Sequence, residues 1–145
     1  LMYCDFVYLG ERTKLRMPFV SLGTCPEFAS SYVVPKVTGH LKAAELLMPG
    51  RFFDAPTAER LGLCNAVLPN AEVEAQARAT AAELVALPPN ALKVTKALMR
   101  RWPGEKTREA MEYESGFFMP MLGQPEAREA FSAFAEKRSP DFSRF

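Results

Sequence analysis

The stretch PFVSLGTCPEFASSYVVPKVTG, residues 18–39, is almost entirely apolar or small and polar. Between Phe19 and Lys36 it carries a single charged side chain, that of Glu27. Prolines and a glycine predict a loop through residue 26. A short helix is expected through EFASSYVV, with Pro35 and Gly39 marking its end. The isolated carboxylate at this junction is the feature of the stretch that needs an explanation.

Glu27 has two interpretations from the residues alone. It is either a half-exposed acid at the start of a helix, where a negative charge stabilises the helix dipole, or a general base in an apolar pocket. Burial in such a pocket disfavours the charged form of a carboxyl group, so that the group can both take and return a proton near neutral pH. Position in the sequence leaves both interpretations open.

Short strands and helices alternate on either side of this stretch. CDFVY, ending at Gly10, and residues 13–17 are expected to be strands. GHLKAAELLMPG predicts a helix that starts near His40. RFFDA and LCNAVLP are brief extended segments, and DAPTAERLG between them predicts a helix capped by Asp54.

From residue 70 onward, the sequence pattern predicts only helices. The first helix, NAEVEAQARATAAELV, has Asn70 as its expected cap, and NALKVTKALMRR forms a second. A third is expected over about residues 106–119, and a last helix starts near Pro125. The third helix carries two apolar stripes: Ala110, Tyr113 and Phe117, and Met111, Phe118 and Leu122. Two stripes exceed the needs of one core face, which favours either deep burial or a subunit interface.

These elements predict an α/β (α+β) chain of two parts. Residues 1–69 would form short βα units, and residues 70–145 a helical region. Because the strands are too few and too short to make a good sheet, we expect further structure before Leu1.

Composition excludes several classes of function. The 145 residues are 48% hydrophobic, and 18 basic against 17 acidic side chains leave a net charge of +1, which gives no reason to expect nucleic acid as a partner. No apolar run approaches the ~18 residues of a membrane span. Basic residues do cluster late, where a solvated helix face is the main interpretation and a phosphate site the alternative: Lys93, Lys96, Arg100 and Arg101, then Lys137 and Arg138.

The potential chemistry is narrow. The three cysteines form no close pair, and His40 is the only histidine, so neither a metal centre nor a Ser-His-Asp triad is expected. No glycine-rich phosphate loop is present. Free thiols favour a reducing compartment, with the cytoplasm expected and peroxisome or mitochondrion left open.

A set of motifs follows in order along nearly the whole chain: CD at residues 4–5, PF..LG..PE at 18–27, SSY and PK..G, A.ELL..G, DA..A..LGL...V, LPPNALK..K and AF.EKR. As a set, these motifs resemble the crotonase (enoyl-CoA hydratase/isomerase) superfamily. The resemblance implies the C-terminal part of a crotonase-like ββα spiral core, with the active-site loop in residues 1–69. Residues 70–145 would be a helical trimerisation region, giving a homotrimer or a dimer of trimers. It also implies an acyl-CoA thioester substrate and no cofactor apart from the coenzyme A that this substrate carries.

Within the superfamily the pattern is closest to the Δ3,Δ2-enoyl-CoA isomerases, whose single catalytic glutamate falls at Glu27. Of the two glutamates of a hydratase, one would fall before Leu1, and the other falls at Phe19. An apolar side chain there would keep water from the site. The oxyanion hole of the family would also lie before Leu1.

The resemblance assigns further residues to the ligand. Phe134 would pack against the acyl-CoA, and Lys137 would meet a CoA phosphate, often across a subunit boundary; a core aromatic and a solvated lysine are the alternatives. Phe19 and Phe28 are expected to wall the acyl pocket, as is Tyr32, for which core packing is the simpler account. A hydratase or other crotonase-type reaction, and a non-catalytic acyl-CoA-binding module, remain as alternative functions.

Overall fold

The computed structural model describes residues 1–145, except for the side chain of Trp102. By its internal contacts the chain divides into two compact units. Unit 1 contains Leu1–Leu15 and Phe52–Lys106, and unit 2 contains Arg16–Arg51 and Thr107–Phe145. The predicted division into residues 1–69 and 70–145 concerns the roles of two halves of the chain, and it stays a prediction.

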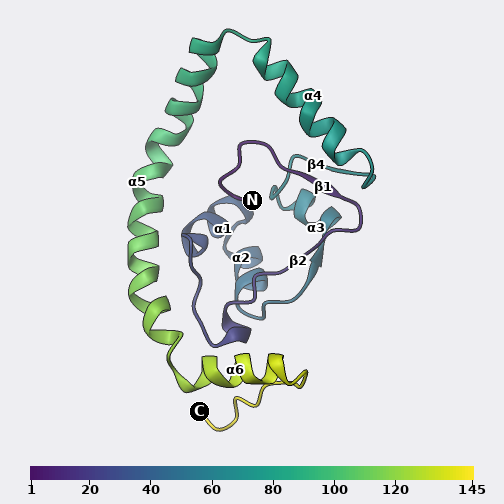
Figure 1. Ribbon diagram of the computed structural model, residues 1–145. Coiled ribbons are helices and arrows are strands. Elements are labelled where there is room, and N and C mark those ends of the chain that lie inside the picture. The colour runs from purple at the N-terminus through teal and green to yellow at the C-terminus, as the bar shows by residue number, and fades with distance from the viewer. The chain divides into compact units, whose positions relative to one another are not determined.

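Unit 1 is built on two short strand pairs. β1 (Tyr8–Gly10) runs parallel to β4 (Ala66–Leu68), and β2 (Lys14–Leu15) runs antiparallel to β3 (Phe53–Asp54) (Figure 1). The prediction of a strand through CDFVY was wrong except at its last residue. Val7 is held by Asn65 instead of by a strand ladder, since each backbone N–H donates to an oxygen of the other residue at 2.7 Å.

The core of unit 1 lies where α3 (Ala55–Arg60) packs beside the strands. Leu9, Ala55 and Ala58 are buried there, surrounded by partly buried apolar side chains. As predicted, Asp54 caps α3: its carboxylate accepts a hydrogen bond from the Thr57 backbone N–H at 2.9 Å. Hydrogen bonds from Thr57 also hold the pKa of Asp54 below its usual range.

Unit 1 also contains α4 (Val73–Val85) and the first part of α5 (Pro89–Met121). α4 begins after Glu72, so the predicted cap at Asn70 was wrong. The Asn70 side chain instead lies against the turn after β1, where its oxygen accepts from the Arg12 N–H at 3.4 Å. α5 begins in unit 1, where Lys96 and Arg100 both pair with Asp5. The side chains of Lys96 and Arg100 are 52% and 54% exposed, which agrees with a solvated helix face, the main interpretation of the late basic cluster, for these two residues.

α5 is one helix, although the sequence predicted separate helices over residues 90–101 and about 106–119. A proline removes only one backbone donor from a helix, and the residues on both sides of Pro103 keep helical geometry. Among the helices of the described residues, none combines the length and the apolar character that crossing a membrane requires.

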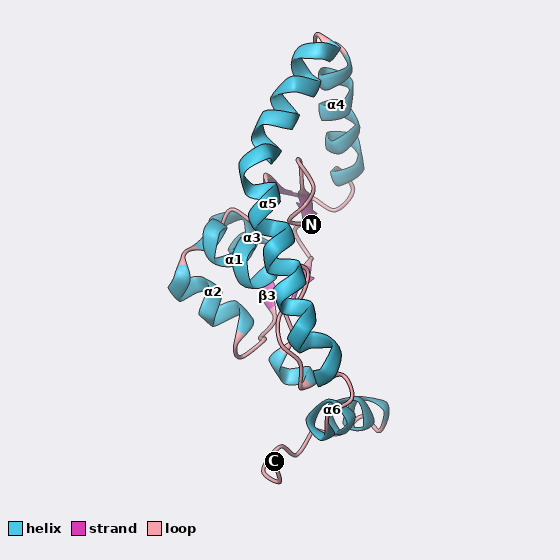
Figure 2. Ribbon diagram, turned by 90° about the vertical axis from the view of Figure 1, so that its left-hand side faces the viewer, coloured by secondary structure: helices cyan, strands magenta, loops and turns pink.

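The regular elements of unit 2 are all helices, joined by loops (Figure 2). It contains a 3₁₀ turn, η1 (Val20–Leu22), then α1 (Ser30–Thr38), α2 (His40–Leu47), the second part of α5 and α6 (Pro125–Ala135). The prediction that Pro35 marks the end of the helix before Gly39 was wrong, since Pro35 lies inside α1 and the helix ends at Thr38, next to Gly39. His40 begins α2, as predicted. The buried apolar residues of this unit are Ala29, Val34, Ala43, Leu46, Leu47, Ala127, Ala130 and Ala133.

The two apolar stripes of α5 are not both buried in this chain. Tyr113 and Phe117 are exposed and contact each other edge to face, with ring centroids 5.1 Å apart. Met111 and Phe118 are partly buried. Deep burial within this chain was therefore the wrong explanation for the stripe that contains Tyr113 and Phe117. The other explanation, an interface between subunits, stays a proposal.

A glycine fixes the contact between η1 and α6. Gly23 ends η1 with a left-handed backbone, φ 69°. A Cβ placed on it would lie 2.5 Å from the Ala127 backbone nitrogen, so only glycine lets α6 approach this closely. Residues 23–29, called here the Glu27 loop, start from this contact.

Candidate functional site

The Glu27 loop places its carboxylate in solvent. Glu27 is exposed and lies three residues before Ser30, the first residue of α1. The predicted apolar pocket is therefore not formed around it by the described residues, and the predicted helix start at Glu27 was also wrong. Both the N–H and the hydroxyl of Ser30 donate to the Glu27 carbonyl oxygen, which fixes the backbone but leaves the side chain outside the helix.

Two consecutive residues with left-handed backbones follow Glu27. Phe28 has φ 60° and Ala29 has φ 56°, and neither is glycine. The Phe28 side chain is 65% exposed, whereas Ala29 is fully buried. A left-handed non-glycine residue costs on the order of 1–3 kcal/mol and persists only where the surrounding structure enforces it. The turn next to Glu27 is thus strained and must be held by other contacts.

The side chain that holds this turn is Glu114, which the sequence analysis missed. Glu114 lies on α5 and is only 5% exposed. One carboxylate oxygen accepts from the Ala29 N–H at 2.6 Å and the other from the Ser31 N–H at 2.8 Å. The signal was present, because Glu114 stands four residues from both Ala110 and Phe118 on the inward face of the helix. A buried acid there requires hydrogen-bond partners.

Cys25 lies close to both acids. Its thiol approaches the Glu114 carbonyl oxygen at 4.0 Å. Burial raises the pKa of the Cys25 thiol, and the negative charges of Glu114 and Glu27 raise it further. Cys25 is therefore a neutral thiol at neutral pH and a poor nucleophile.

Phe19 and Tyr32 flank the Glu27 loop in the sequence and are both partly buried. Phe19 precedes η1, and its carbonyl oxygen accepts from the N–H and the hydroxyl of Thr24, at 3.0 and 2.9 Å. Tyr32 lies in α1 with the Lys36 ammonium 5.4 Å from its ring centroid. Their predicted place in the wall of an acyl pocket stays a prediction.

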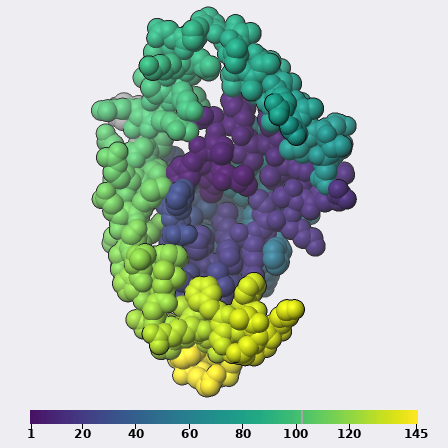
Figure 3. Space-filling view, in the orientation of Figure 1, coloured from purple at the N-terminus to yellow at the C-terminus, as the bar shows by residue number. Residues whose placement is uncertain are grey.

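The two predicted CoA contacts lie at the end of α6. Phe134 is 80% exposed, and Lys137 follows the helix with φ 56°. The Lys137 N–H donates to the Phe134 carbonyl at 3.2 Å and the Arg138 N–H to the Ala133 carbonyl at 2.9 Å. This is the Schellman ending of a helix, in which glycine normally takes the left-handed position. The yellow side chains of this region lie at the surface in Figure 3.

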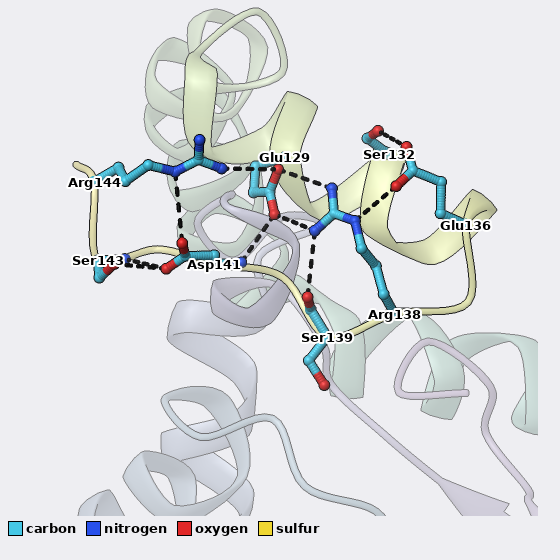
Figure 4. A network of polar contacts seen from close by, with 8 residues as sticks. All are labelled: Glu129, Ser132, Glu136, Arg138, Ser139, Asp141, Ser143 and Arg144. Carbon is cyan, nitrogen blue, oxygen red and sulfur yellow. Dashed lines mark hydrogen bonds and ion pairs between the residues drawn. The ribbon is translucent and has the colours of Figure 1, made fainter.

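A network of ion pairs fixes the chain that follows Lys137 (Figure 4). The Arg138 guanidinium binds both carboxylate oxygens of Glu129 and also pairs with Glu136. Glu129 additionally accepts the Asp141 N–H at 2.9 Å. Hydrogen bonds from Arg138 and Asp141 lower the pKa of Glu129 to about 2.

This lowered pKa predicts a loss of stability in acid. An acid whose folded-state pKa is depressed stabilises the fold above its unfolded pKa, here near 4.5, and loses that contribution as the pH falls toward about 2. Glu129→Gln should therefore unfold at lower urea concentration than wild type at pH 7, with the difference disappearing near pH 2. The exposed Glu83→Gln is the control. An equal difference between Glu129→Gln and wild type at both pH values would contradict this role.

No group of three or more His, Cys, Asp and Glu side chains is placed to hold a metal ion within the described part of the chain.

Unit 2 contains all five predicted site residues: Phe19, Glu27, Phe28, Phe134 and Lys137. Glu27 and Phe28 are neighbours in one strained turn, whereas Phe134 and Lys137 belong to the end of α6.

The chain was compared with known protein families and proteins. The family described as "Enoyl-CoA hydratase/isomerase" matches residues 1–144. A probable enoyl-CoA hydratase of Mycobacterium bovis is 31% identical over 98% of this chain and 55% of its own length. Enoyl-CoA delta isomerase 2 of Rattus norvegicus is 36% identical over 76% of this chain and 28% of its own length. The chain thus spans about half the length of the first of these relatives.

A solved structure shows the same fold. The enoyl-CoA hydratase/isomerase of Pseudoalteromonas atlantica T6c matches with a TM-score of 0.92 and 34% identity, over 98% of this chain and 57% of that protein. The likeness confirms the predicted fold class, a mixed α/β, crotonase-like fold that this chain contains in part.

Proposed function

Because the chain belongs to the enoyl-CoA hydratase/isomerase family, we propose that it carries the acid/base residue of an enoyl-CoA isomerase. The reaction would move a double bond of a fatty acyl-CoA from C3 to C2. The reaction is proposed for the intact protein, since this chain spans only about half the length of the Mycobacterium bovis relative. The observation that carries the proposal is that Glu27 is the single carboxylate of the loop. By the resemblance, Phe19 occupies the position where a hydratase has one of its two catalytic glutamates.

The chemistry needs one base that also acts as an acid. The Glu27 carboxylate would take a proton from C2, so that the electron pair of that C–H bond forms a dienolate across the thioester. The C3=C4 bond then becomes C2=C3 as the protonated Glu27 returns a proton to C4. The atoms of substrate and product are the same, so no water or redox partner takes part. The apolar Phe19 would disfavour a bound water at this site.

The remaining site residues would bind the acyl-CoA. Phe28 projects from the turn next to Glu27 and, with Phe19, would line the acyl chain. Phe134 offers an exposed aromatic face, and Lys137 a positive charge suited to a CoA phosphate. The left-handed backbone of Lys137 supports this assignment, since a strained residue where glycine would fit better is typical of a functional position.

The substitution Lys137→Gly should change acyl-CoA affinity and the free energy of unfolding in opposite directions. Glycine adopts the left-handed backbone without strain, so the free energy of unfolding should rise by about 1 kcal/mol. Loss of the ammonium should at the same time weaken acyl-CoA binding by about tenfold, since a hydrogen bond to a charged group contributes roughly 1.5–3 kcal/mol. Urea unfolding and calorimetric titration with CoA measure the two effects. Unchanged CoA affinity would remove Lys137 from the site.

The experiment that tests the function follows the proton. Intact protein is given a 3-enoyl-CoA deuterated at C2, and the 2-enoyl product is analysed for deuterium at C4. A single acid/base should carry part of the label from C2 to C4, with the remainder exchanged because Glu27 is exposed. Label at C4 supports a single acid/base, whereas a wild-type rate in Glu27→Gln would reject the single-carboxylate mechanism.

Hydration of a 2-enoyl-CoA is the second candidate. It is favoured by the probable hydratase of Mycobacterium bovis, with which this chain aligns over nearly its full length. Offering the intact protein both a 2-enoyl-CoA and a 3-enoyl-CoA separates the candidates, because only a hydratase forms the 3-hydroxy product. A protein that binds acyl-CoA but converts neither would be a non-catalytic module.

A homotrimer or a dimer of trimers is proposed as the assembly. The support is the exposed stripe of α5 around Tyr113 and Phe117, whose aromatic rings would be covered by another subunit. Sedimentation equilibrium of the intact protein tests this, and a monomer would reject it.

A further inference from the structure

We infer that Glu114 is a positioning residue that sets the orientation of Glu27 through the backbone of the turn between them. This inference rests on the proposed role of Glu27. Glu114 stands 85 residues from Ala29 in the sequence, and its carboxylate is buried against the start of α1. It would act on the reaction without touching the substrate.

The first support is the geometry of the hydrogen bonds. The two oxygens of Glu114 accept from two different backbone groups, the Ala29 N–H at 2.6 Å and the Ser31 N–H at 2.8 Å. Hydrogen bonds to a carboxylate are shorter and about twice as strong as neutral ones. Two acceptors from one rigid helix therefore fix both the position and the direction of this segment.

The second support is that α1 lacks a cap of its own. Ala29 occupies the cap position and has no side-chain oxygen, so the free N–H groups of the first turn need another acceptor. Glu114 supplies it from a distant part of the chain. The bond to Ala29 also falls on one of the two left-handed residues, where it offsets the backbone strain.

The consequence for Glu27 follows from its place in the chain. Only Phe28 separates Glu27 from Ala29, and the Glu27 carbonyl is itself bonded to Ser30. A change in the dihedral angles of the turn would redirect the Glu27 side chain. Since Glu27 is exposed, the turn is what determines where its carboxylate lies.

The test is Glu114→Gln in the intact protein. A glutamine keeps one acceptor but turns an amide N–H₂ toward the second backbone N–H, so the turn loses a bond. We expect kcat for 3-enoyl-CoA isomerisation to fall about a hundredfold with KM nearly unchanged, the cost of a base displaced by about 1 Å. The matched control is Glu112→Gln, an exposed glutamate on the same helix, which should keep wild-type kcat.

A double variant distinguishes positioning from plain stability. If Glu114 acts through Glu27, adding Glu114→Gln to Glu27→Gln should lower the rate no further. A purely structural residue would lower the melting temperature but leave kcat per folded molecule unchanged, and that result would overturn the inference. Should Glu114→Gln not fold, Glu114→Asp, which keeps both oxygens on a shorter side chain, is judged by the same kcat criterion.

Amide hydrogen exchange needs no substrate and separates this inference from the proposed function. Exchange at Ala29 and Ser31 should be faster in Glu114→Gln than in Glu112→Gln. Unchanged exchange would overturn the positioning role whatever reaction the protein performs. Failure of the wild-type protein to isomerise a 3-enoyl-CoA, with exchange responding as expected, would reject the proposed reaction alone.

Discussion

Replacing Glu27 by glutamine is expected to lower the kcat for 3-enoyl-CoA isomerisation by about a thousandfold, with little change in KM. Glutamine has the same shape as glutamate but cannot take a proton from C2 or return one to C4. The substrate contacts proposed for Phe28 and Lys137 would remain in place. Steady-state kinetics of the intact variant measure the effect.

The exposure of Glu27 provides a control for this experiment. A small carboxylate from solution can reach an exposed position, so formate should restore part of the activity of Glu27→Ala but none to Glu27→Gln, where the amide fills the space. Sedimentation should show the same assembly for wild type and both variants. Full activity in Glu27→Gln would mean that another group removes the proton.

Gly23→Ala is expected to lower the free energy of unfolding by on the order of 3 kcal/mol. The added methyl group would lie 2.5 Å from the Ala127 nitrogen and 2.6 Å from the Glu126 carbonyl carbon, both backbone atoms that cannot turn aside. The left-handed backbone adds a further cost of roughly 1 kcal/mol. Urea unfolding followed by far-ultraviolet circular dichroism measures the loss.

Gly116→Ala is the matched control for this substitution. Gly116 lies in α5, and a Cβ built on it meets nothing within 4 Å. Alanine should therefore stabilise the helix by about 1 kcal/mol. If both variants were equally stable, the contact between η1 and α6 would not constrain Gly23 as described. The displacement of α6 in Gly23→Ala should also weaken CoA binding through Phe134 and Lys137.

Local sequence signals predicted the local parts of the fold. Asp54 caps α3 and His40 begins α2, because a cap and a glycine act on residues next to them. Asn70 failed as a cap since its side chain is engaged with the turn after β1, a contact between residues far apart in sequence. The two helices predicted over residues 90–101 and about 106–119 are one, because the helix continues through Pro103.

The same distinction applies to the candidate site. Glu27 could be singled out as the lone charge of an apolar stretch, and the resemblance gave it a role. Its exposure was one of the two interpretations, but its place outside α1 could not be predicted, because the turn before α1 is held by Glu114, a residue of another helix. The sequence shows that Glu114 lies among apolar residues of a helix, but it does not show that the Ala29 and Ser31 N–H groups are its hydrogen-bond partners.

The contact between Glu114 and α1 also bears on when the turn can form. Unit 2 is assembled from Arg16–Arg51 and Thr107–Phe145, with residues 52–106 between them. Contacts across such long separations close large loops and are established late in folding. On the ribosome, Ala29 and Ser31 emerge well before Glu114 has been translated. The turn beside Glu27 can therefore take its final shape only after Glu114 and its part of α5 have left the exit tunnel.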